Sequence, residues 1–296
     1  MAAPPSPSGP PSQAVSSPAS PSAPSAGLPL TRRSASGPLR IGVLVSATGA
    51  NLTTLLGMRD ARPDEFDVCL VASQGERVKA LDVARAAGVE AWTGDFDRHC
   101  GTASAARGPE ARARYRARAR EWHDGLEARL ADWERRNGEL DLLVLAYHRW
   151  IEGRLLERYQ GRMLNQHPAD LSVLTGRGTR RFTGKDPVLL AMAAGRPATR
   201  TSCFLVDATQ DGGPVLAMGP EVPVGRRRPI REDAWEQELE QKDRSDRPCL
   251  RWTVGAFAAG RLSLGAGAHP DGSRVVLVDG APTPLGGRRL TEEEDA

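Results

Sequence analysis

Three continuous apolar runs, each followed by a segment of helical character, constrain the fold of this chain more than any other feature. They span 39–46 (LRIGVLVS), 67–73 (DVCLVAS) and 140–147 (LDLLVLAY). Runs of this length that are apolar at successive positions are typical of strands buried on both faces. Strands that alternate with helices favour a parallel sheet, because a parallel connection needs a crossover. The sequence therefore predicts an α/β fold with a Rossmann-like, mostly parallel sheet flanked by helices.

Further elements extend this pattern. The segments ATGANLTTLLGM, GERVKALDVARAAGV and IEGRLLERY read as helices, and VEAWTGD and GRMLNQ read as short strands. From about residue 200 the runs TSCFLVDA, GPVLAMGPEVPV, GRLSLGAG and SRVVLVDG predict strands that are joined without long helices. We therefore expect a mixed or antiparallel C-terminal extension of the sheet.

A charged segment, residues 109–139, predicts one long helix. Apolar side chains recur in it at spacings of three and four, at Tyr115, Ala119, Trp122, Leu126, Leu130 and Trp133. This is one apolar stripe on a helix of about six or seven turns. We interpret its arginines as a solvated outer face, because an RNA-binding arm would carry aromatic residues on its basic side.

The first 38 residues are set apart by their composition. Residues 1–38 are rich in Pro, Ser and Ala, contain no acidic residue and have almost no large apolar side chain. Such a segment cannot bury enough apolar surface to fold, so we expect a disordered tail. A transit peptide is the alternative, since these are also Ser-rich and poor in acids. The folded domain is predicted to span residues 39–290.

Composition also argues against several classes of function. The formal net charge of +3 is too small to indicate a nucleic-acid partner. The four cysteines and five histidines are scattered, which indicates neither a disulfide framework nor a metal site. No apolar run is long enough to span a bilayer. We expect a cytoplasmic protein, a monomer or homodimer, that acts on small molecules without a metal.

Three short motifs carry groups that could do chemistry. The turn SATGAN (46–51) joins a strand to a helix, so its backbone N–H groups could bind an anion, or it could be an ordinary turn. Asn165 and His167 point to the same side of an extended chain and could address one carbonyl group, although a loop histidine is the plainer interpretation. Asp211, before two glycines, could orient His167 and favour its protonated form, or serve the turn alone.

The ordered set of these motifs resembles the folate-dependent formyltransferases. The order is strand, S-x-x-G-x-N-L and helix, then N-x-H-P after an apolar run, then D-G-G-P-V followed by V-P-V. Within the family, the sequence is most similar to the enzymes that formylate glycinamide ribonucleotide in purine synthesis. The resemblance runs from about residue 39 to the C-terminus and implies the formyltransferase fold.

The resemblance also implies roles for individual residues. The catalytic trio would be Asn165, His167 and Asp211, which transfer a formyl group directly from 10-formyltetrahydrofolate to an amine. The other implied residues are Gly49, Ala50 and Asn51 for the substrate phosphate, Asp243 for the ribose, and Arg149, Trp150 and Ile151 for the folate. The folate would be a cosubstrate, and no metal is implied.

Two departures from the family pattern concern the acceptor. Ala47 and Ala50 replace a glycine and a hydroxyl residue of the phosphate turn. The segment after His-Pro is longer than usual and carries cationic side chains that either contact an anionic substrate or are solvated, namely Arg177, Arg180, Arg181 and Lys185. The alternatives are an N-formyltransferase for another amine, such as an amino sugar, and a formyltetrahydrofolate hydrolase. A methionyl-tRNA formyltransferase is less similar, because too little chain follows for its RNA-binding barrel.

Overall fold

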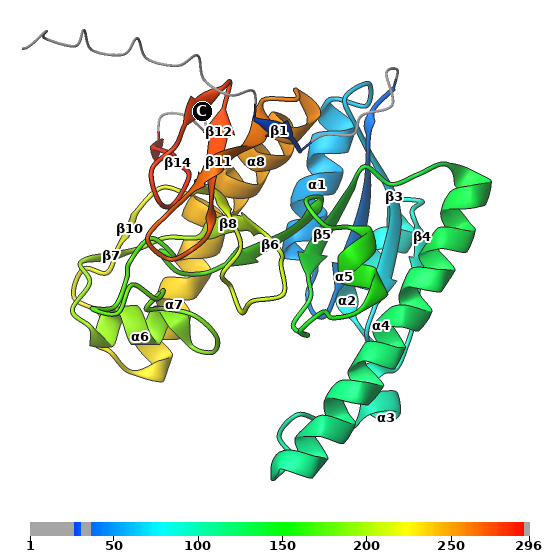
Figure 1. Cartoon of the computed structure of the whole chain (residues 1–296), viewed down its shortest axis with the longest axis horizontal. Coiled ribbons are helices and arrows are strands. Elements are labelled where there is room, and N and C mark those ends of the chain that lie inside the picture. The colour runs from blue at the N-terminus through cyan, green and yellow to red at the C-terminus, as the bar shows by residue number, and fades with distance from the viewer. Residues whose placement is uncertain (1–26, 31–36, 293–296) are drawn as a thin grey trace, which may run out of the picture.

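The computed structural model describes residues 27–30 and 37–292. Within this part of the chain, eight strands form one sheet in the order β14-β9-β8-β6-β5-β2-β3-β4 (Figure 1). Their bounds are β2 Leu39–Val45, β3 Phe66–Ser73, β4 Glu90–Trp92, β5 Leu142–Ala146, β6 Met163–His167, β8 Ser202–Leu205, β9 Val215–Met218 and β14 Arg288–Arg289. Five adjacent strands, β4, β3, β2, β5 and β6, run parallel to one another, which confirms the predicted sheet.

Helices cover both faces of this sheet. One core cluster joins the sheet to α1 (Ala50–Ala61), α2 (Lys79–Ala86) and α8 (Arg247–Ala258). A second cluster joins the other face to α4 (Pro109–Asn137) and α5 (Arg154–Arg158). The strands of the parallel core are buried from both sides, which explains why their sequences are continuously apolar.

The C-terminal part both extends the sheet and departs from the prediction. β8 is antiparallel to β6, and β9 is antiparallel to β8, as expected for a mixed extension. However, the expectation of strands without long helices is wrong, because α7 (Arg231–Gln241), the π-helix η1 (Lys242–Asp246) and α8 intervene. Glu, Gln and Ala favour helix in α7, and α8 buries Leu250, Val254 and Phe257 at helical spacing.

The strands that follow α8 form a separate small sheet, except β14, which joins the large one. The small sheet contains β11 (Leu262–Ala268), β12 (Arg274–Val278), β13 (Ala281–Pro282) and, at its other edge, β1 (Leu28–Pro29). The predicted tail is therefore wrong for residues 27–30. Leu28 and Pro29 pair with β11, because the edge of this strand offers backbone hydrogen-bond partners. The side chain of Leu30 is buried in the hydrophobic core. The rest of residues 1–36 lies outside the described residues.

Two short helices and one two-stranded pair complete the fold. They are α3 (Phe96–Cys100), α6 (Pro187–Ala193) and the two-stranded pair of β7 (Ala198–Thr199) with β10 (Val222–Pro223). In the described residues no helix is both long and apolar enough to cross a membrane.

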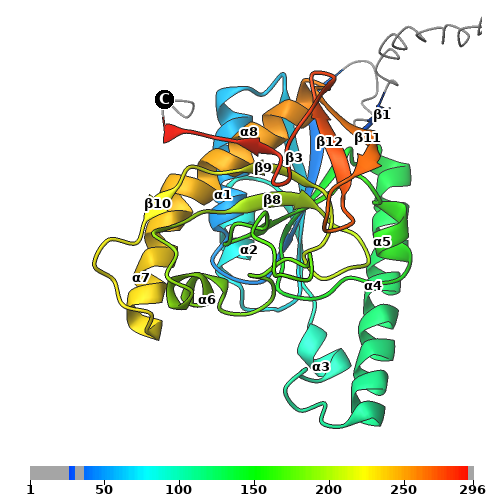
Figure 2. The same cartoon turned by 60° about the vertical axis from the view of Figure 1, so that its left-hand side comes forward.

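The long helix α4 exceeds its predicted length. It has 29 residues, which is about eight turns at ~3.6 residues per turn rather than six or seven. Its C-terminal half packs on the sheet, whereas its N-terminal half projects away from the body of the molecule together with α3 (Figures 1 and 2). The predicted apolar stripe faces the body, since Leu130 and Trp133 are buried and Trp122 is half-buried.

Candidate active site

The predicted catalytic residues meet at the carboxyl end of β6. Asn165 and His167 are alternate residues of this strand, so their side chains leave the same face of the sheet. β6 lies between β5 and β8, with Asn165 opposite Leu145 and Phe204. Ligands of parallel sheets bind beyond the carboxyl ends of the strands, so this pair lies where a ligand is expected.

The imidazole of His167 is buried and held from two sides. Its Nε2 lies 2.7 Å from the carbonyl oxygen of Phe182, and its Nδ1 lies 3.8 Å from Oδ2 of Asp211. A carbonyl oxygen only accepts, so Nε2 carries the hydrogen. Burial lowers the pKa of His167, and the nearby Asp211 carboxylate opposes this effect. Asp211 thus acts in the expected direction, toward the protonated form, but desolvation is the larger of the two effects on the pKa of His167.

The loop from β8 to β9 places Asp211. This residue has a left-handed backbone, with φ at 50°, and its Oδ2 accepts a hydrogen bond of 2.9 Å from the backbone N–H of Gly184. Steric contact requires glycine after Asp211. A Cβ at Gly213 would lie 1.8 Å from the carbonyl oxygen of Leu205. The Asp-Gly-Gly motif thus lets the loop pass close to β8 while the carboxylate turns toward His167.

Arg180 connects this loop to the rest of the fold. Its side chain is buried and forms an ion pair of 2.7 Å with Asp271, in the turn between β11 and β12. It also donates hydrogen bonds to the backbone carbonyl groups of Asp211 and Gly213. Of the four cationic side chains in the long segment after His-Pro, Arg180 is therefore structural, whereas Arg177, Arg181 and Lys185 are exposed.

The turn predicted to bind phosphate begins α1. Gly49 caps this helix with φ at 87°, and a Cβ there would lie 2.9 Å from Cβ of Ala80 on α2. This contact and the left-handed backbone are enough to require glycine at position 49, whether or not the turn binds a ligand. The N–H groups of Ala50 and Asn51 lie in the first turn of α1, where an anion would find donors. His148, which follows β5, donates its backbone N–H to Oγ of Ser46 at 2.9 Å, so the turn adjoins the end of β5.

The predicted folate residues follow β5 directly. The guanidinium of Arg149 is anchored by Gln74 at 2.9 Å and by Asp97 at 2.8 Å, and it stacks over the ring of Phe96. Trp150 is 43% exposed, so its indole is accessible to a ligand. Ile151 is buried in the core with the α5 residues, so its side chain supports the site from behind.

The acidic residue predicted to contact ribose is not gathered with the others. Asp243 is exposed and forms an ion pair of 2.9 Å with Arg247. Asp246 lies closer to β6, because its backbone carbonyl accepts a hydrogen bond of 2.8 Å from the side chain of Gln166. Its carboxyl group also accepts from the hydroxyl of Thr201. The sequence analysis did not single out Asp246, which lies with Asp243 in the π-helix η1, and no sequence pattern indicates where such a helix forms.

Two other observations concern a cavity beside the site and the possibility of a metal ion. A hollow of about 900 Å³ opens beside the loop of Asp211, and its lining includes Arg162, Arg180 and Gln210 but none of the trio. The hollow is therefore separate from the place where Asn165, His167 and Asp211 meet. Within the described residues there is no cluster of three His, Cys, Asp or Glu side chains that could hold a metal ion.

Comparison with known proteins gives a consistent answer. Residues 39–227 match the formyl transferase family. The phosphoribosylglycinamide formyltransferase of two Mycobacterium tuberculosis strains is 33% identical over 191 residues, which is 64% of this chain and 73% of that protein.

Solved structures agree with this result at the level of fold. The glycinamide ribonucleotide transformylase 1 of Symbiobacterium toebii is 27% identical with a TM-score of 0.57, covering 81% of this chain and 94% of its own. A phosphoribosylglycinamide formyltransferase of Coxiella burnetii has a TM-score of 0.62 at 20% identity, covering 86% and 99%. A formyltetrahydrofolate deformylase of Burkholderia mallei shares the fold, with a TM-score of 0.54 at 19% identity, covering 81% and 70%.

Proposed function

Because this chain belongs to the formyl transferase family, we propose that it transfers a formyl group from 10-formyltetrahydrofolate to the amine of glycinamide ribonucleotide, a step of purine biosynthesis. The observation that carries the proposal is the meeting of Asn165, His167 and Asp211 at the carboxyl end of β6. The Mycobacterium tuberculosis relatives, which bear the name of this activity, support the choice of acceptor.

The reaction requires a tetrahedral intermediate whose oxygen is negatively charged. The amine nitrogen attacks the formyl carbon, the bond from that carbon to N10 of the folate breaks, and the proton of the amine goes to N10. Asn165 would donate its side-chain N–H to the formyl oxygen as charge develops there. Donors that are fixed in a buried site stabilise such charge more than water does.

His167 would stabilise the same oxygen from its Nε2. This N–H group faces a carbonyl oxygen, that of Phe182, at 2.7 Å. We infer that the formyl oxygen takes the place of the Phe182 carbonyl when the donor binds. As the oxygen becomes negative, Nδ1 would take up the proton that the attacking amine releases, by way of the Asp211 carboxylate, which then stabilises the imidazolium. The same proton would return by this route to N10 of the folate when the bond from the formyl carbon to N10 breaks.

The acceptor would lie between the α1 turn and η1. Its phosphate would bind the N–H groups of Gly49, Ala50 and Asn51, and its ribose would contact an acidic residue of the η1 segment. The family resemblance implies Asp243 for this contact, but Asp246 lies against β6. We therefore propose Asp246 for this contact.

The deciding experiment supplies purified protein with 10-formyltetrahydrofolate and glycinamide ribonucleotide and follows the absorbance of the folate product. Turnover that depends on both substrates is expected. An absence of turnover with glycinamide ribonucleotide together with turnover of an amino sugar would change the proposed acceptor. Consumption of the donor without any acceptor would instead indicate a hydrolase, a reaction class represented by the deformylase relative.

The proposed role of His167 has its own test. His167→Ala should lower kcat by about 10²- to 10⁴-fold, because it removes both proton transfer and charge stabilisation. His269→Ala, in the turn after β11, is the matched control and should keep its rate. Comparable rates in the His167 variant and in the native protein would exclude this role.

A further inference from the structure

The helical segment formed by α7 and η1 carries one row of charged side chains. Glu238, Lys242 and Asp246 follow one another at intervals of four residues, which places them on one face of this segment. The end of the row is fixed at the candidate site, because the backbone carbonyl of Asp246 accepts a hydrogen bond of 2.8 Å from the side chain of Gln166 on β6. Lys242 therefore lies one helical turn from the contact with β6.

The charges of this row act on the side chains around the site. Burial has the largest effect on the pKa of His148, His167 and Asp246. Beyond burial, the Glu238 carboxylate raises the pKa of all three groups. The Lys242 ammonium lowers the pKa of His148 and of Asp246. Both charges are therefore within electrostatic reach of the ends of β5 and β6, where the acceptor is proposed to bind.

The row also lies at the same edge of the sheet as the turn that precedes α1. This turn follows β2, and Asp246 lies at the end of β6, so both are at the carboxyl edge of the parallel strands. α8, which continues directly from η1, packs against α1 in one core cluster, and Figure 1 shows the two helices side by side. β5 lies between β2 and β6, and His148 at its end donates its backbone N–H to Ser46 of the turn. η1 therefore brings Lys242 to the edge at which this turn lies.

The turn itself supplies no positively charged side chain. Gly49, Ala50 and Asn51 offer backbone N–H groups, and the first turn of α1 contains neither Lys nor Arg. The N-terminus of a helix carries a partial charge of about +0.5, whereas a phosphate monoester carries about −1.5 to −2 at pH 7. A phosphate bound there would keep most of its negative charge, so a cation beside it would bind it more strongly than the turn alone does.

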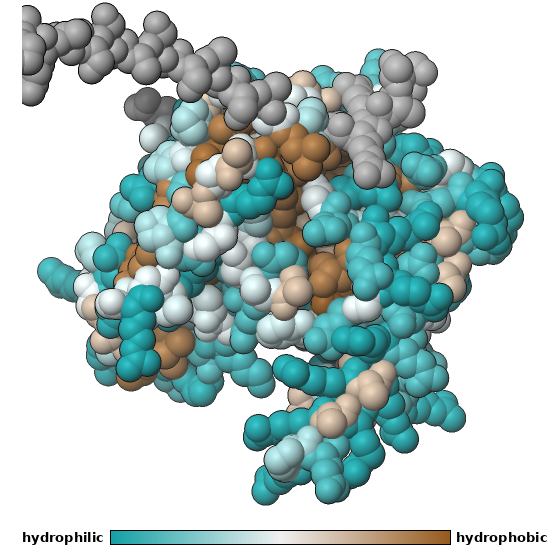
Figure 3. Space-filling model, viewed as in Figure 1, coloured by the Kyte–Doolittle hydropathy of each residue, from teal (hydrophilic) through white to brown (hydrophobic). Residues whose placement is uncertain are grey.

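Lys242 is a cation that remains accessible to a ligand. Its ammonium pairs with Glu238 at 3.5 Å and lies 5.0 Å from the centre of the Trp235 ring. The side chain is 34% exposed, and an ammonium has three N–H donors, so it can bind an anion and keep Glu238 as its partner. Trp235 and Leu239 are themselves exposed, and Figure 3 shows apolar residues among the hydrophilic ones where α6 and α7 lie. Apolar surroundings reduce screening by water and strengthen the attraction of an anion.

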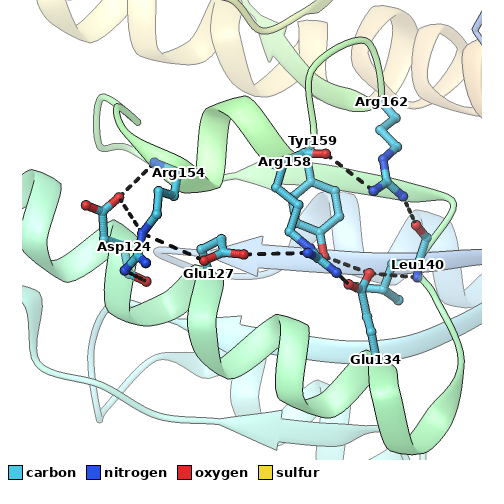
Figure 4. A network of polar contacts seen from close by, with 8 residues as sticks. All are labelled: Asp124, Glu127, Glu134, Leu140, Arg154, Arg158, Tyr159 and Arg162. Carbon is cyan, nitrogen blue, oxygen red and sulfur yellow. Dashed lines mark hydrogen bonds and ion pairs between the residues drawn. The ribbon is translucent and has the colours of Figure 1, made fainter.

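An ion pair that serves the fold differs from this one. On the other face of the sheet, the carboxylate of Glu134 accepts hydrogen bonds from Arg158 and from the Tyr159 hydroxyl, and Figure 4 shows these groups turned toward one another. The Glu134 side chain is only 2% exposed. The pair of Lys242 and Glu238 is instead open to solvent at the carboxyl edge of the sheet, where a ligand can reach it.

We propose that Lys242 binds the phosphate group of the acceptor and makes the protein select a phosphorylated amine over the same amine without phosphate. This inference rests on the proposed function, which assigns the phosphate to the turn of residues 49–51. The backbone N–H groups of the turn would bind the phosphate on one side, and the Lys242 ammonium would bind it on the other by a charge-assisted hydrogen bond. Glu238 would orient the lysine side chain. Lys242 is thus a specificity residue of the proposed reaction.

Binding measurements without a formyl donor test this role. Calorimetry on the full chain compares glycinamide ribonucleotide with glycinamide riboside, which lacks only the phosphate. The native protein should bind the nucleotide roughly 10²-fold more tightly, because the turn and Lys242 both contact the phosphate. Lys242→Met should bind the nucleotide about tenfold more weakly than the native protein, the loss expected for one partly exposed charged hydrogen bond. Its affinity for the riboside should not change, and Lys242→Arg should keep most of the preference.

The matched control is Arg244→Met, two residues further along η1. The Arg244 guanidinium is bound to Glu240 at 2.6 Å and to Glu292, so this variant should keep both native affinities. Turnover provides a second readout. Lys242→Met should raise the KM for the nucleotide about tenfold and leave kcat and the KM for the formyl donor unchanged, because the phosphate is remote from the reacting amine.

The outcomes separate this inference from the proposed function. Equal affinities of the native protein for the nucleotide and the riboside would overturn the inference and leave the formyl transfer standing. An undiminished preference in Lys242→Met would also overturn it, because the turn alone would then bind the phosphate. A preference that Lys242→Met loses, in a protein that does not turn over the nucleotide, would support the role of Lys242 and contradict the proposed acceptor. Binding of neither form would overturn both.

Discussion

Arg180 holds the loop on which Asp211 depends. Its guanidinium and the carboxylate of Asp271 are both almost fully buried, at 4% and 3% side-chain exposure. The remaining donors reach the backbone of the loop at Asp211 and Gly213. Burying a charge this deeply costs free energy of desolvation, and only the ion pair with its partner compensates that cost.

The variant Arg180→Met should therefore destabilise the protein by about 3–5 kcal/mol, since it leaves the Asp271 carboxylate buried and unpaired. This corresponds to a fall in Tm of roughly 10 °C for a chain of this size, measured by thermal unfolding. Formyl transfer by the surviving folded protein should also slow. The double variant R180M/D271N should recover part of the lost stability, and strictly additive effects of the two changes would contradict the pairing.

Asp246 gives the protein a predictable response to pH. Burial raises the pKa of its carboxyl group to about 7, while the Thr201 hydroxyl and Lys242 act in the opposite direction. The ordinary value is 3.8, so between about pH 4 and pH 7 the folded protein keeps a proton that the unfolded chain has released. Stability from this group therefore falls as the pH rises through that window and is constant above it.

Thermal unfolding at a series of pH values would detect this effect. Asp246→Asn removes the titration, so its Tm should decline less than that of the native protein between about pH 4 and pH 7. The exposed Asp243, three residues earlier, provides the matched control, and Asp243→Asn should follow the native curve. Parallel curves for the native protein and the Asp246 variant would show that this carboxyl group does not titrate as described.

At the scale of single residues, the sequence indicates only part of the site. Strand alternation places Asn165 and His167 on one face without any structure. The partners of His167 come from Phe182 and Asp211, which lie in segments without periodicity, so their approach follows from the fold alone. For Arg180 the sequence leaves open contact with an anionic substrate or solvation. The structure instead buries it in an ion pair with Asp271, a structural role that composition does not reveal.

At the scale of elements, the short strand β1 is the least expected feature. Residues 27–30 carry no strand pattern, yet the backbone of Leu30 bonds to Leu262 at 3.1 Å and its side chain is only 6% exposed. A two-residue strand has too few positions to show alternation, so pattern analysis cannot detect it. The parallel strands were predictable for the opposite reason, since burial on both faces makes their whole sequence apolar.

Truncation tests the contribution of β1. Deleting residues 1–30 should lower stability by about 2 kcal/mol, the amount gained when one leucine side chain is buried. Deleting residues 1–26 is the matched control and should leave the Tm unchanged, because that segment has almost no large apolar side chain. If both truncated proteins melted at the native temperature, β1 would not contribute to the stability of the folded chain.

At the scale of the whole molecule, one core joins the parallel sheet to the C-terminal part. A single cluster contains Leu39 of β2, Leu164 of β6, Phe257 of α8 and Val276 of β12. The proposed site draws on the same two parts, with His167 from β6 and Asp211 from the loop after β8. We therefore propose that residues 39–290 unfold as one unit, and that a ligand in the site stabilises all of it.

Calorimetric unfolding with and without 10-formyl-5,8-dideazafolate, a stable analogue of the proposed formyl donor, tests whether residues 39–290 unfold as one unit. The free protein should show one transition whose calorimetric and van't Hoff enthalpies agree. At a free concentration of about 100 times its Kd, the analogue should add roughly 2.7 kcal/mol and move the whole transition upward, with a shift that grows with the logarithm of concentration. Two resolved transitions, of which the analogue moves one, would mean that the parallel sheet and the C-terminal extension fold separately, because a shared core cannot melt in one part and persist in the other.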